Sequence, residues 1–304
     1  MNSTPPLVTV IIAAHNGAHT IGEQLEALAD QRDAPRFEVL VVDNNSTDDL
    51  ASVVAELSAR LDVRIVPASE LQGQAYARNI GAEAARGTFI LFCDQDDMVS
   101  PQWVESLSSL LREPGTFATG PLELRRYNSD EVRILFAGSD ADEVTPYTIG
   151  GYLPFAYGCN LGFRRSDFLE LGGFDNSFQG GGEDQDLSWR AIENGLRLSV
   201  SPQAKVSYRL RDEARGLLRQ QRGYGRSGSL LRTRFADRGL PGPSVRWVVA
   251  RMPETLVTLA CLQVSPDRVS LRDAKRAGTV LGSAEALVRY RLLRQIPPRQ
   301  LIRA

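Results

Sequence analysis

Three carboxylates stand within four consecutive residues, directly after an apolar run that is typical of a buried strand. In the segment 92–97, which reads FCDQDD, they are Asp94, Asp96 and Asp97. Because anions this close repel one another, a turn that collects them favours a bound cation. Hard divalent metals such as Mg²⁺ and Mn²⁺ take carboxylate oxygens together with the phosphate oxygens of a substrate. The cluster therefore predicts a metal that clamps a diphosphate, and a solvated acidic turn is the alternative.

A second acidic cluster follows a run of glycines at the expected start of a helix. Segment 180–186 reads GGGEDQD, and its glycines permit close backbone approach. A helix N-terminus stabilises carboxylates and would keep them ionised. A general base must be ionised and within hydrogen-bond reach of the hydroxyl that it deprotonates, so Asp184 and Glu183 are candidate bases. Since Glu183 and Arg190 share a helix face, we expect these two to pair while Asp184 points elsewhere; plain stabilisation of the helix end is the alternative.

Other polar residues lie where predicted strands end. Asp43 ends the second strand and could accept from a base N–H or a ribose hydroxyl, although turn-forming aspartates are common. Ala14, His15 and Asn16 end the first strand, and His15 is a candidate neighbour of a nucleotide base, with a plain loop histidine as the alternative. Arg78 lies on a helix rich in small residues, where it could reach a base or phosphate or form an ordinary salt bridge.

Strands and helices alternate in the part of the chain that carries these residues. Apolar runs predict strands at 7–14, 37–42, 62–66 and 88–93, and helical spacing predicts helices at 21–28, 50–61, 74–86 and 100–111. Short apolar strands between helices are typical of a parallel sheet that is covered on both faces. In such sheets ligands bind beyond the carboxyl ends of the strands. The polar residues above all fall at those ends, so we expect one shared site.

The next hundred residues predict further strands at 117–126, 159–164, 196–201 and 205–209 and a helix at 183–194. Residues 128–151 are polar and rich in Gly and Pro, and we expect a mobile loop over the site there. Beyond Asp212 the chain is rich in arginine and helical, with interruptions at glycines and at Pro241 and Pro243.

Charge is divided unevenly along the 304 residues, although the net charge is only -2. Residues 1–204 hold 14 Lys and Arg against 30 Asp and Glu, and the last hundred residues hold 21 against 7. The basic part is expected to meet a membrane surface, phosphates, nucleic acid or the acidic part of the chain itself. The cysteines number three, without metal-ligand spacing, which fits a reducing compartment. We see neither a secretory signal nor an 18-residue apolar run, so we expect a cytoplasmic protein, at most at the inner face of the cell membrane.

Taken together, five segments in their order resemble the family 2 glycosyltransferases, which have the nucleotide-binding fold called GT-A. The matching segments are 8–16, 41–48, 73–81, 92–97 and 181–186. The resemblance covers roughly Val8 to Arg226. It implies an α/β fold with a mainly parallel sheet: a GT-A domain at 1–208, acceptor-side elements at about 117–208, and a helical extension at 209–304 that acts as a lid, a membrane contact or a dimer contact.

The resemblance also implies roles for the matching positions. Asp43 would contact the base, Asp94 would lie near the ribose, and Asp184 would be the general base of an inverting transfer. Mn²⁺ or Mg²⁺ would be held by Asp96, with Asp94 and Asp97 close by, and UDP is the expected nucleotide. The full set of expected nucleotide-sugar contacts is Ala14, His15, Asn16, Asp43, Arg78, Asp94, Gln95, Asp96 and Arg222.

Two departures from the family pattern matter. Many relatives carry a metal-binding His where this chain has Tyr208, a poor ligand when neutral. Processive synthases carry a Gln-x-x-Arg-Trp signature and membrane helices, which we do not find, so we expect single additions. Gln221, Arg222 and Arg226 are expected diphosphate contacts on a closing lid, with a solvated basic helix as the alternative.

The leading hypothesis is a transferase that moves a sugar to a glycan, lipid-linked or small-molecule acceptor in cell-surface glycan or glycolipid synthesis. A sugar-phosphate nucleotidyltransferase is the runner-up, but the first strand lacks a glycine-rich basic loop after it. A non-catalytic module that binds an anionic surface is a third hypothesis; we expect no nucleic-acid partner, because arginines replace lysines and acids are scattered among them. Segments 245–262 and 281–293 mix apolar residues with arginine, which suits a lipid surface, packing on the main domain or a homodimer contact.

Overall fold

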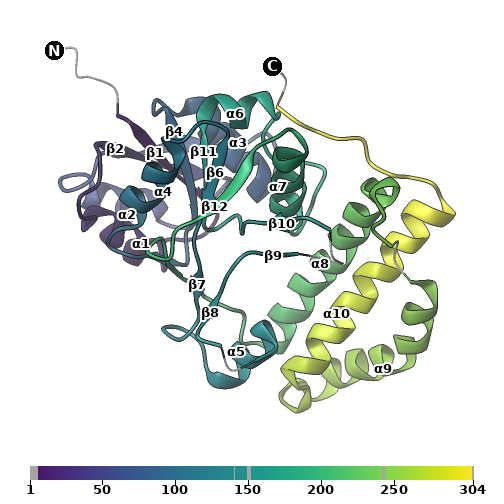
Figure 1. The fold of residues 1–304 in the computed structure, drawn as a ribbon. Helices are drawn as coiled ribbons and strands as arrows, with labels where there is room; N and C mark the ends of the chain where they lie inside the picture. Colours follow the sequence, from purple (N-terminus) through teal and green to yellow (C-terminus); the bar gives the residue numbers. More distant parts are fainter. Residues whose placement is uncertain (1–5, 140, 149–151, 242–243, 303–304) are drawn as a thin grey trace.

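The computed structural model describes residues 6–139, 141–148, 152–241 and 244–302. Its centre is a seven-stranded sheet in the order β12-β6-β11-β4-β1-β2-β3 (Figure 1). The first four predicted strands are present and parallel: β1 (Val8–Ala14), β2 (Phe37–Asp43), β3 (Val63–Pro67) and β4 (Phe89–Asp94). On the other side of β4 lie β11 (Leu161–Arg164), β6 (Thr116–Thr119) and β12 (Arg197–Val200), of which β11 runs antiparallel to both its neighbours. The prediction of a mainly parallel sheet is confirmed.

Helices cover both faces of this sheet, because side chains along each strand alternate between two cores. Val10 and Ile12 point into one core and Ile11 into the other, and all three are fully buried. The first core is closed by α1 (Ile21–Ala29), α2 (Leu50–Leu57) and α4 (Trp103–Leu111). The second is closed by α3 (Gln74–Ala84), α6 (Arg165–Glu170) and α7 (Glu183–Glu193). Both acidic clusters therefore lie on well-packed elements: Asp94 ends β4, and Asp184 lies in the first turn of α7.

A smaller four-stranded sheet brings the far part of the chain to the carboxyl end of β4. Its order is β5-β13-β7-β8, from β5 (Met98–Val99), β13 (Val206–Ser207), β7 (Leu122–Glu123) and β8 (Glu143–Val144). In it Val206 pairs with Val99 and Ser207 with Met98. This register places the residues that follow β13 beside the acidic turn that precedes β5. A further pair joins β9 (Tyr147–Thr148) and β10 (Pro154–Phe155).

The expectation of a loop over 128–151 is wrong in its first half, which forms helix α5 (Asp130–Ala137). Ser129 caps it by accepting from the backbone N–H of Val132, acids fill its first turn, and Gly138 ends it at φ 74°. Each of these features stabilises a helix end. Residues 140 and 149–151 of the expected loop lie outside the described residues.

The C-terminal region is helical, as expected, with α8 (Ala214–Arg234), α9 (Val245–Val264) and α10 (Leu271–Ala286). Helices α8 and α10 approach closely because glycines line their contact: a Cβ on Gly278 would lie 2.4 Å from the carbonyl O of Leu218. No helix among the described residues has the length and apolar character needed to cross a membrane. After α10 the chain returns to the sheet domain, where the N–H of Ile302 donates to the carbonyl O of Gly172 at 2.8 Å (Figure 1).

Candidate active site

The two acidic clusters meet at Arg78. Its guanidinium is 2% exposed and donates through Nη2 to Asp94 Oδ1 at 2.6 Å and through Nη1 to Glu183 Oε1 at 3.3 Å. The ring of Phe174 lies 5.3 Å from the guanidinium carbon. Opposite charges on both sides hold the pKa of Arg78 above its usual range even though burial opposes the charged form. Arg78 thus forms salt bridges inside the site, and it fixes β4 and α7 relative to each other.

The expected pairing of Glu183 with Arg190 is wrong. Arg190 Nε donates to Asp186 Oδ2 at 2.7 Å, and the remaining nitrogens of Arg190 reach backbone carbonyls of Leu171 and Gly173. Asp186 and Arg190 form an i to i+4 pair, whose side chains are neighbours on a helix, whereas Glu183 lies seven residues from Arg190, about two turns away. Glu183 pairs instead with Arg78, which comes from another helix.

The carboxyl groups of α7 are more basic than a helix N-terminus alone would make them. Burial raises the pKa of Glu183 to about 7, with repulsion from Asp184 adding to it and Arg78 opposing it. Burial also raises the pKa of Asp184. The expectation that the helix dipole keeps the carboxylates ionised is therefore corrected for Glu183, where desolvation outweighs the dipole. Asp184 Oδ2 accepts from the N–H of Gly158 at 3.1 Å, which orients this carboxylate.

The residues that follow β13 form hydrogen bonds with the acidic turn after β4. The N–H of Arg209 donates to Asp97 Oδ1 at 2.9 Å, and Nε of Arg209 donates to the carbonyl O of Asp96 at 3.0 Å. Arg211 Nη2 lies 3.5 Å from Asp96 Oδ2. Sequence reasoning missed both arginines, and the available signal was their position one and three residues after Tyr208, which the family pattern already placed at the site.

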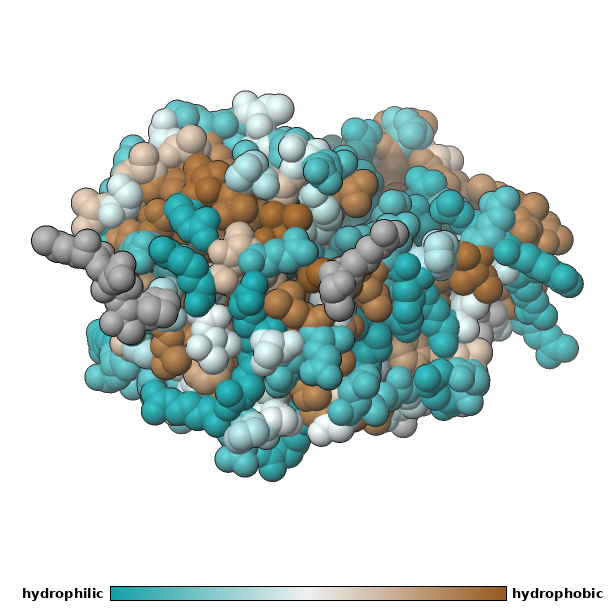
Figure 2. Space-filling model, turned by 90° about the horizontal axis from the view of Figure 1, so that it is seen from above, coloured by the Kyte–Doolittle hydropathy of each residue, from teal (hydrophilic) through white to brown (hydrophobic). Residues whose placement is uncertain are grey.

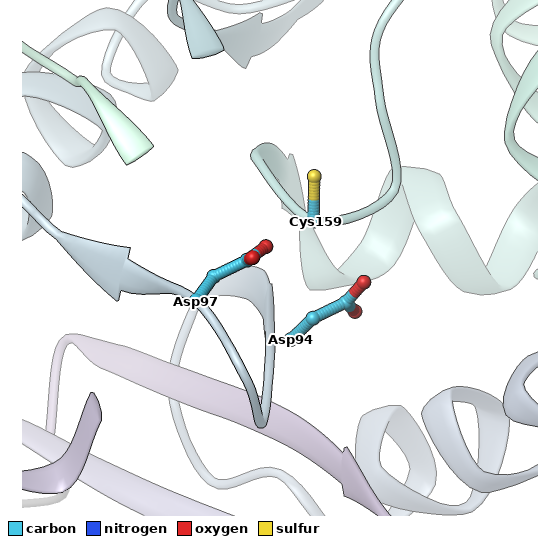
Figure 3. A group of neighbouring side chains, drawn as sticks. All are labelled: Asp94, Asp97 and Cys159. Atoms are coloured by element: carbon cyan, nitrogen blue, oxygen red, sulfur yellow. The ribbon is translucent and has the colours of Figure 1, made fainter. Parts of the chain in front are cut away.

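Asp94, Asp97 and Cys159 each offer one ligand atom, and these atoms lie within 4.8 Å of one another (Figure 3). Asp97 is 1% exposed, and its Oδ2 has no hydrogen-bond partner among the described residues. Burial and the charges of Asp94 and Asp96 raise its pKa well above the usual range. A cation would relieve this repulsion and satisfy the orphaned oxygen, so the carboxylates fit a hard divalent metal. Asp96 stands outside the group, facing Arg211, which differs from its expected place as principal ligand.

A cavity of about 260 Å³ opens at the carboxyl ends of β1, β2 and β4. Five of the expected contacts line it, namely Ala14, His15, Asp94, Gln95 and Asp96. Gln95 joins β4 to β1, because Oε1 accepts from the N–H of His15 at 2.9 Å and Nε2 donates to the carbonyl O of His15 at 3.2 Å. A Cβ on Gly17 would lie 2.2 Å from Gln95 Oε1, so this glycine leaves space for the Gln95 side chain.

Asp43 and Asn16 do not line this cavity within the described part of the chain. Asp43 Oδ1 accepts from the N–H of Ser46 at 2.9 Å and so closes the turn after β2, and Asn16 Oδ1 accepts from the N–H of Thr47 at 2.8 Å and so links the loops after β1 and β2. Asn44, which sequence reasoning overlooked, lines the wall: its carbonyl O lies 3.0 Å from His15 Nδ1 and its Oδ1 accepts from the N–H of Gly73.

A larger cavity of about 1330 Å³ lies between the sheet domain and α8. Asp184, Glu183 and Gly158 line it, and the residues common to both cavities are Gln74, Asp94, Tyr208, Gln220 and Tyr224. The glycine run before α7 lets α8 come close, because Gly180, Gly181 and Gly182 have φ of 100°, 98° and 92°. A Cβ on Gly181 would lie 2.5 Å from the ring of Tyr224.

Arg222 is placed differently from its expected role. It lines the larger cavity, and its Nε donates to Glu285 Oε1 of α10 at 2.6 Å. Arg226 also faces Glu285, at 3.6 Å, and Gln221 accepts from Thr279. These contacts tie α8 to α10. Tyr208 lines both cavities, and burial raises the pKa of its hydroxyl well above the usual range, so it stays neutral.

Comparison with known sequences places this arrangement among sugar-transferring enzymes. The sequence profile described as glycosyl transferase family 2 matches residues 9–172, and the profile described as N-terminal domain of galactosyltransferase matches residues 150–211. The chain is 28% identical over 272 residues to the pre-mycofactocin glycosyltransferase of Mycobacterium tuberculosis, across 85% of this chain and 55% of that protein. It is 30% identical over 216 residues to glycosyltransferase AglE of Haloferax volcanii, across 66% of each. The chain thus spans about half the length of the first of these relatives.

Solved structures share the fold at lower identity. The mannosyltransferase PcManGT from Pyrobaculum calidifontis, in complex with GDP-Man and Mn²⁺, has a TM-score of 0.56 at 22% identity, covering 96% of this chain and 83% of that chain. S. aureus TarS 1-349, in complex with UDP-GlcNAc, has a TM-score of 0.53 at 19% identity, covering 94% and 91%.

Proposed function

The chain belongs to glycosyl transferase family 2 and has the GT-A fold, and on that premise we propose that it moves a sugar from a nucleoside-diphosphate sugar to a hydroxyl of an acceptor. One observation carries this proposal: the cavity at the strand ends and the cavity that holds Asp184 share Asp94 as a wall. The nucleotide occupies the smaller cavity, the acceptor occupies the larger one, and the sugar lies where the two meet.

The reaction inverts the anomeric carbon in a single displacement. The acceptor oxygen forms a bond to the anomeric carbon while the bond from that carbon to the diphosphate oxygen breaks. Asp184 takes the proton of the acceptor hydroxyl, since it lines the larger cavity and its raised pKa makes it a better base than an ordinary aspartate. Glu183 is paired with Arg78, and its charge raises the pKa of the neighbouring Asp184. Glu183 is the second candidate for the base.

The donor contacts follow the lining of the smaller cavity. His15, Asn44 and Gln95 surround the nucleotide, and Asp43 and Asn16 act by shaping the turns around them. UDP is the proposed nucleotide, on the resemblance to the family. Arg209 and Arg211 take the diphosphate role that the sequence suggested for Arg222, because they stand beside Asp96 while Arg222 is paired with Glu285.

Mn²⁺ or Mg²⁺ is the proposed cofactor. Asp94 and Asp97 would hold it, and Asp96 would join them once a diphosphate draws Arg211 away. When bound, such an ion neutralises the negative charge that grows on the leaving diphosphate, and it therefore stabilises the transition state more than the ground state. Cys159 is close enough to contribute, but a thiol suits softer metals.

The acceptor is proposed to be a glycan, a lipid-linked saccharide or a small molecule, made at the inner face of the cell membrane for a surface glycan or glycolipid. The volume of the larger cavity, about 1330 Å³, supports an acceptor larger than one sugar ring. Residues 1–208 form most of the donor site, to which Arg209 and Arg211 add, and residues 209–304 contribute α8, which covers the acceptor side.

Donor binding and turnover test this proposal together. Thermal shift with UDP-glucose, UDP-GlcNAc and GDP-mannose, each with Mn²⁺ and with EDTA, measures binding, because a ligand that binds only the folded state raises the melting temperature. Slow release of UDP or GDP from the stabilising donor measures its reaction with water. We expect one nucleotide sugar to stabilise the protein in a Mn²⁺-dependent way. Stabilisation by nucleoside triphosphates and sugar phosphates, with no response to any nucleotide sugar, would contradict the proposal.

A further inference from the structure

Exposed apolar side chains are concentrated in one part of the described chain. Of fifteen large apolar side chains with high exposure, ten lie within residues 245–296. Single exposed apolar residues are ordinary, whereas a contiguous group marks a surface that meets a partner. At the right-hand end of the molecule in Figure 2, apolar and polar side chains alternate, and this is the end that α9 and the close of α10 occupy in Figure 1.

Helix α9 uses only a narrow seam for packing. Its buried residues Val248, Thr255 and Leu262 repeat every seven positions. Val249 and Leu256 repeat the same way about 100° around the helix, at 65% and 59% exposure. They define an outward apolar stripe that continues to Val257 and Val264 and that the described residues leave uncovered. An ordinary surface helix would present polar residues there.

The close of α10 repeats this pattern. The chain continues from α10 into a π-helical turn, Leu287–Leu292, in which Tyr290 is buried. Leu292 and Leu293, which end and follow that turn, are 74% and 54% exposed. Large apolar side chains are therefore exposed on two separate helices of this region.

Exposed arginines lie in the same segments of the chain as these apolar side chains. Arg246, on α9, and Arg289, Arg291 and Arg294, around the close of α10, are exposed, and none has an ion-pair partner among the described residues. Arg222 pairs with Glu285 and Arg251 with Glu254, whereas Arg219, Arg268 and Arg272 are exposed and likewise have no ion-pair partner among the described residues. The unpaired positive charge is therefore spread over the C-terminal helices, the same part of the chain that carries the exposed apolar stripe.

We propose that this surface, formed by the outward stripe of α9 and the close of α10, binds the headgroup region of an anionic lipid bilayer. Apolar side chains that enter the interface and arginines that meet lipid phosphates are the two components of interfacial binding. A second copy fits less well. A two-fold contact sets each patch against itself, so the free arginines would face one another, and Glu254, the acid on α9, is already paired with Arg251 and Arg276.

Vesicle co-sedimentation tests the proposal without donor or acceptor, so its result is independent of the transferase activity. The probes are phosphatidylcholine vesicles with and without phosphatidylglycerol. One variant, Arg289→Gln with Arg291→Gln, removes charge, and another, Val249→Ser with Leu292→Ser, removes apolar area. The matched controls are Arg32→Gln with Arg112→Gln, two exposed arginines on the sheet domain, and Ile134→Ser, an exposed apolar residue on α5.

We expect binding only to vesicles that contain phosphatidylglycerol, and weakening by salt. The arginine pair should lower the partition coefficient about twenty-five-fold, since each arginine near an anionic surface contributes about fivefold. The apolar pair should also weaken binding, and the controls should bind as wild type does. The proposal is overturned if wild type fails to sediment with anionic vesicles at low salt, or if controls and patch variants lose binding equally. It is also overturned if the wild type forms a dimer that Val249→Ser with Leu292→Ser dissociates.

Discussion

Arg78 and Glu183 form an ion pair between helices α3 and α7, and the same guanidinium holds Asp94 at the end of β4. The side chains of Arg78 and Glu183 are 2% and 7% exposed, so water cannot replace the lost partner if one is removed. Arg78→Met should therefore lower the free energy of unfolding by about 3–5 kcal/mol. Chemical denaturation measures this, and Arg60→Met, which breaks an exposed pair with Asp30, is the control that should change stability by less than about 1 kcal/mol. Equal effects of the two substitutions would show that the buried pair does not support the fold.

Asp184→Asn removes the proposed base but keeps an oxygen that can accept from the N–H of Gly158. Transfer should fall by about 10²- to 10⁴-fold, the usual contribution of a general base, while donor affinity stays close to wild type. Steady-state kinetics and calorimetry with the donor measure the two effects separately. Asp167→Asn, a partly exposed acid on α6, is the matched control. Normal turnover by Asp184→Asn would mean that another group takes the proton.

The pH dependence of transfer should report the pair formed by Glu183 and Asp184. The base Asp184 must be ionised, so kcat/KM should rise with pH, and because burial raises the pKa of Asp184 the rise should lie above the range of an ordinary aspartate. Glu183→Gln removes a negative charge beside Asp184, which lowers the pKa of Asp184 and should move the rise to lower pH. If the pH midpoint of kcat/KM is the same in Glu183→Gln as in the wild type, the charge of Glu183 does not influence the base.

The raised pKa of Glu183 also predicts that the stability of the fold decreases as the pH rises. Because the folded-state pKa of Glu183 lies above its ordinary value of 4.5, the folded protein binds the proton more tightly. Its contribution to stability is complete below about pH 4.5 and is lost as the pH rises through about 7. Glu183→Gln should flatten this part of the stability profile, which urea titrations at several pH values measure. If the stability of Glu183→Gln depends on pH as that of the wild type does, a group other than Glu183 titrates in this range.

Metal binding should depend on Asp97 and hardly on Cys159. Asp97→Asn replaces the carboxylate whose Oδ2 lacks a partner among the described residues, and Mn²⁺ affinity should fall at least about tenfold. Cys159→Ser should keep affinity within about threefold, because Mn²⁺ prefers oxygen ligands. Calorimetry with Mn²⁺ in the presence of UDP measures both. If the cysteine variant loses affinity and the aspartate variant keeps it, the site suits a softer metal.

Local patterns were sufficient to predict most of the sheet domain. Continuous apolar runs such as 7–14 and 88–93 predict buried parallel strands, and the carboxyl ends of such strands meet at one edge. Asp94 and the acids of α7 could therefore be assigned to one region of the molecule before any coordinates. The helix at 130–137 was also readable from Ser129, its acidic first turn and Gly138, but the polar composition outweighed that signal.

Side-chain pairing between distant elements was beyond the sequence. Local spacing favours Asp186 over Glu183 as the partner of Arg190, but the pair of Glu183 with Arg78 joins α7 to α3, and no local spacing encodes that contact. The arginines at 209 and 211 reach the acidic turn only because β13 pairs with β5, two strands of two residues each. The contact of Arg222 with Glu285 also depends on tertiary structure, because glycines in α8 and α10 let the two helices pack closely enough for these side chains to meet.

A crystal structure with a nucleoside-diphosphate sugar and Mn²⁺, with anomalous data that locate the manganese, tests the central claim most directly. We predict one manganese between Asp94 and Asp97, the diphosphate beside Arg209 and Arg211, and the sugar facing Asp184 across the wall that the two cavities share. Manganese and diphosphate bound elsewhere, or a sugar that points away from Asp184, would contradict the account.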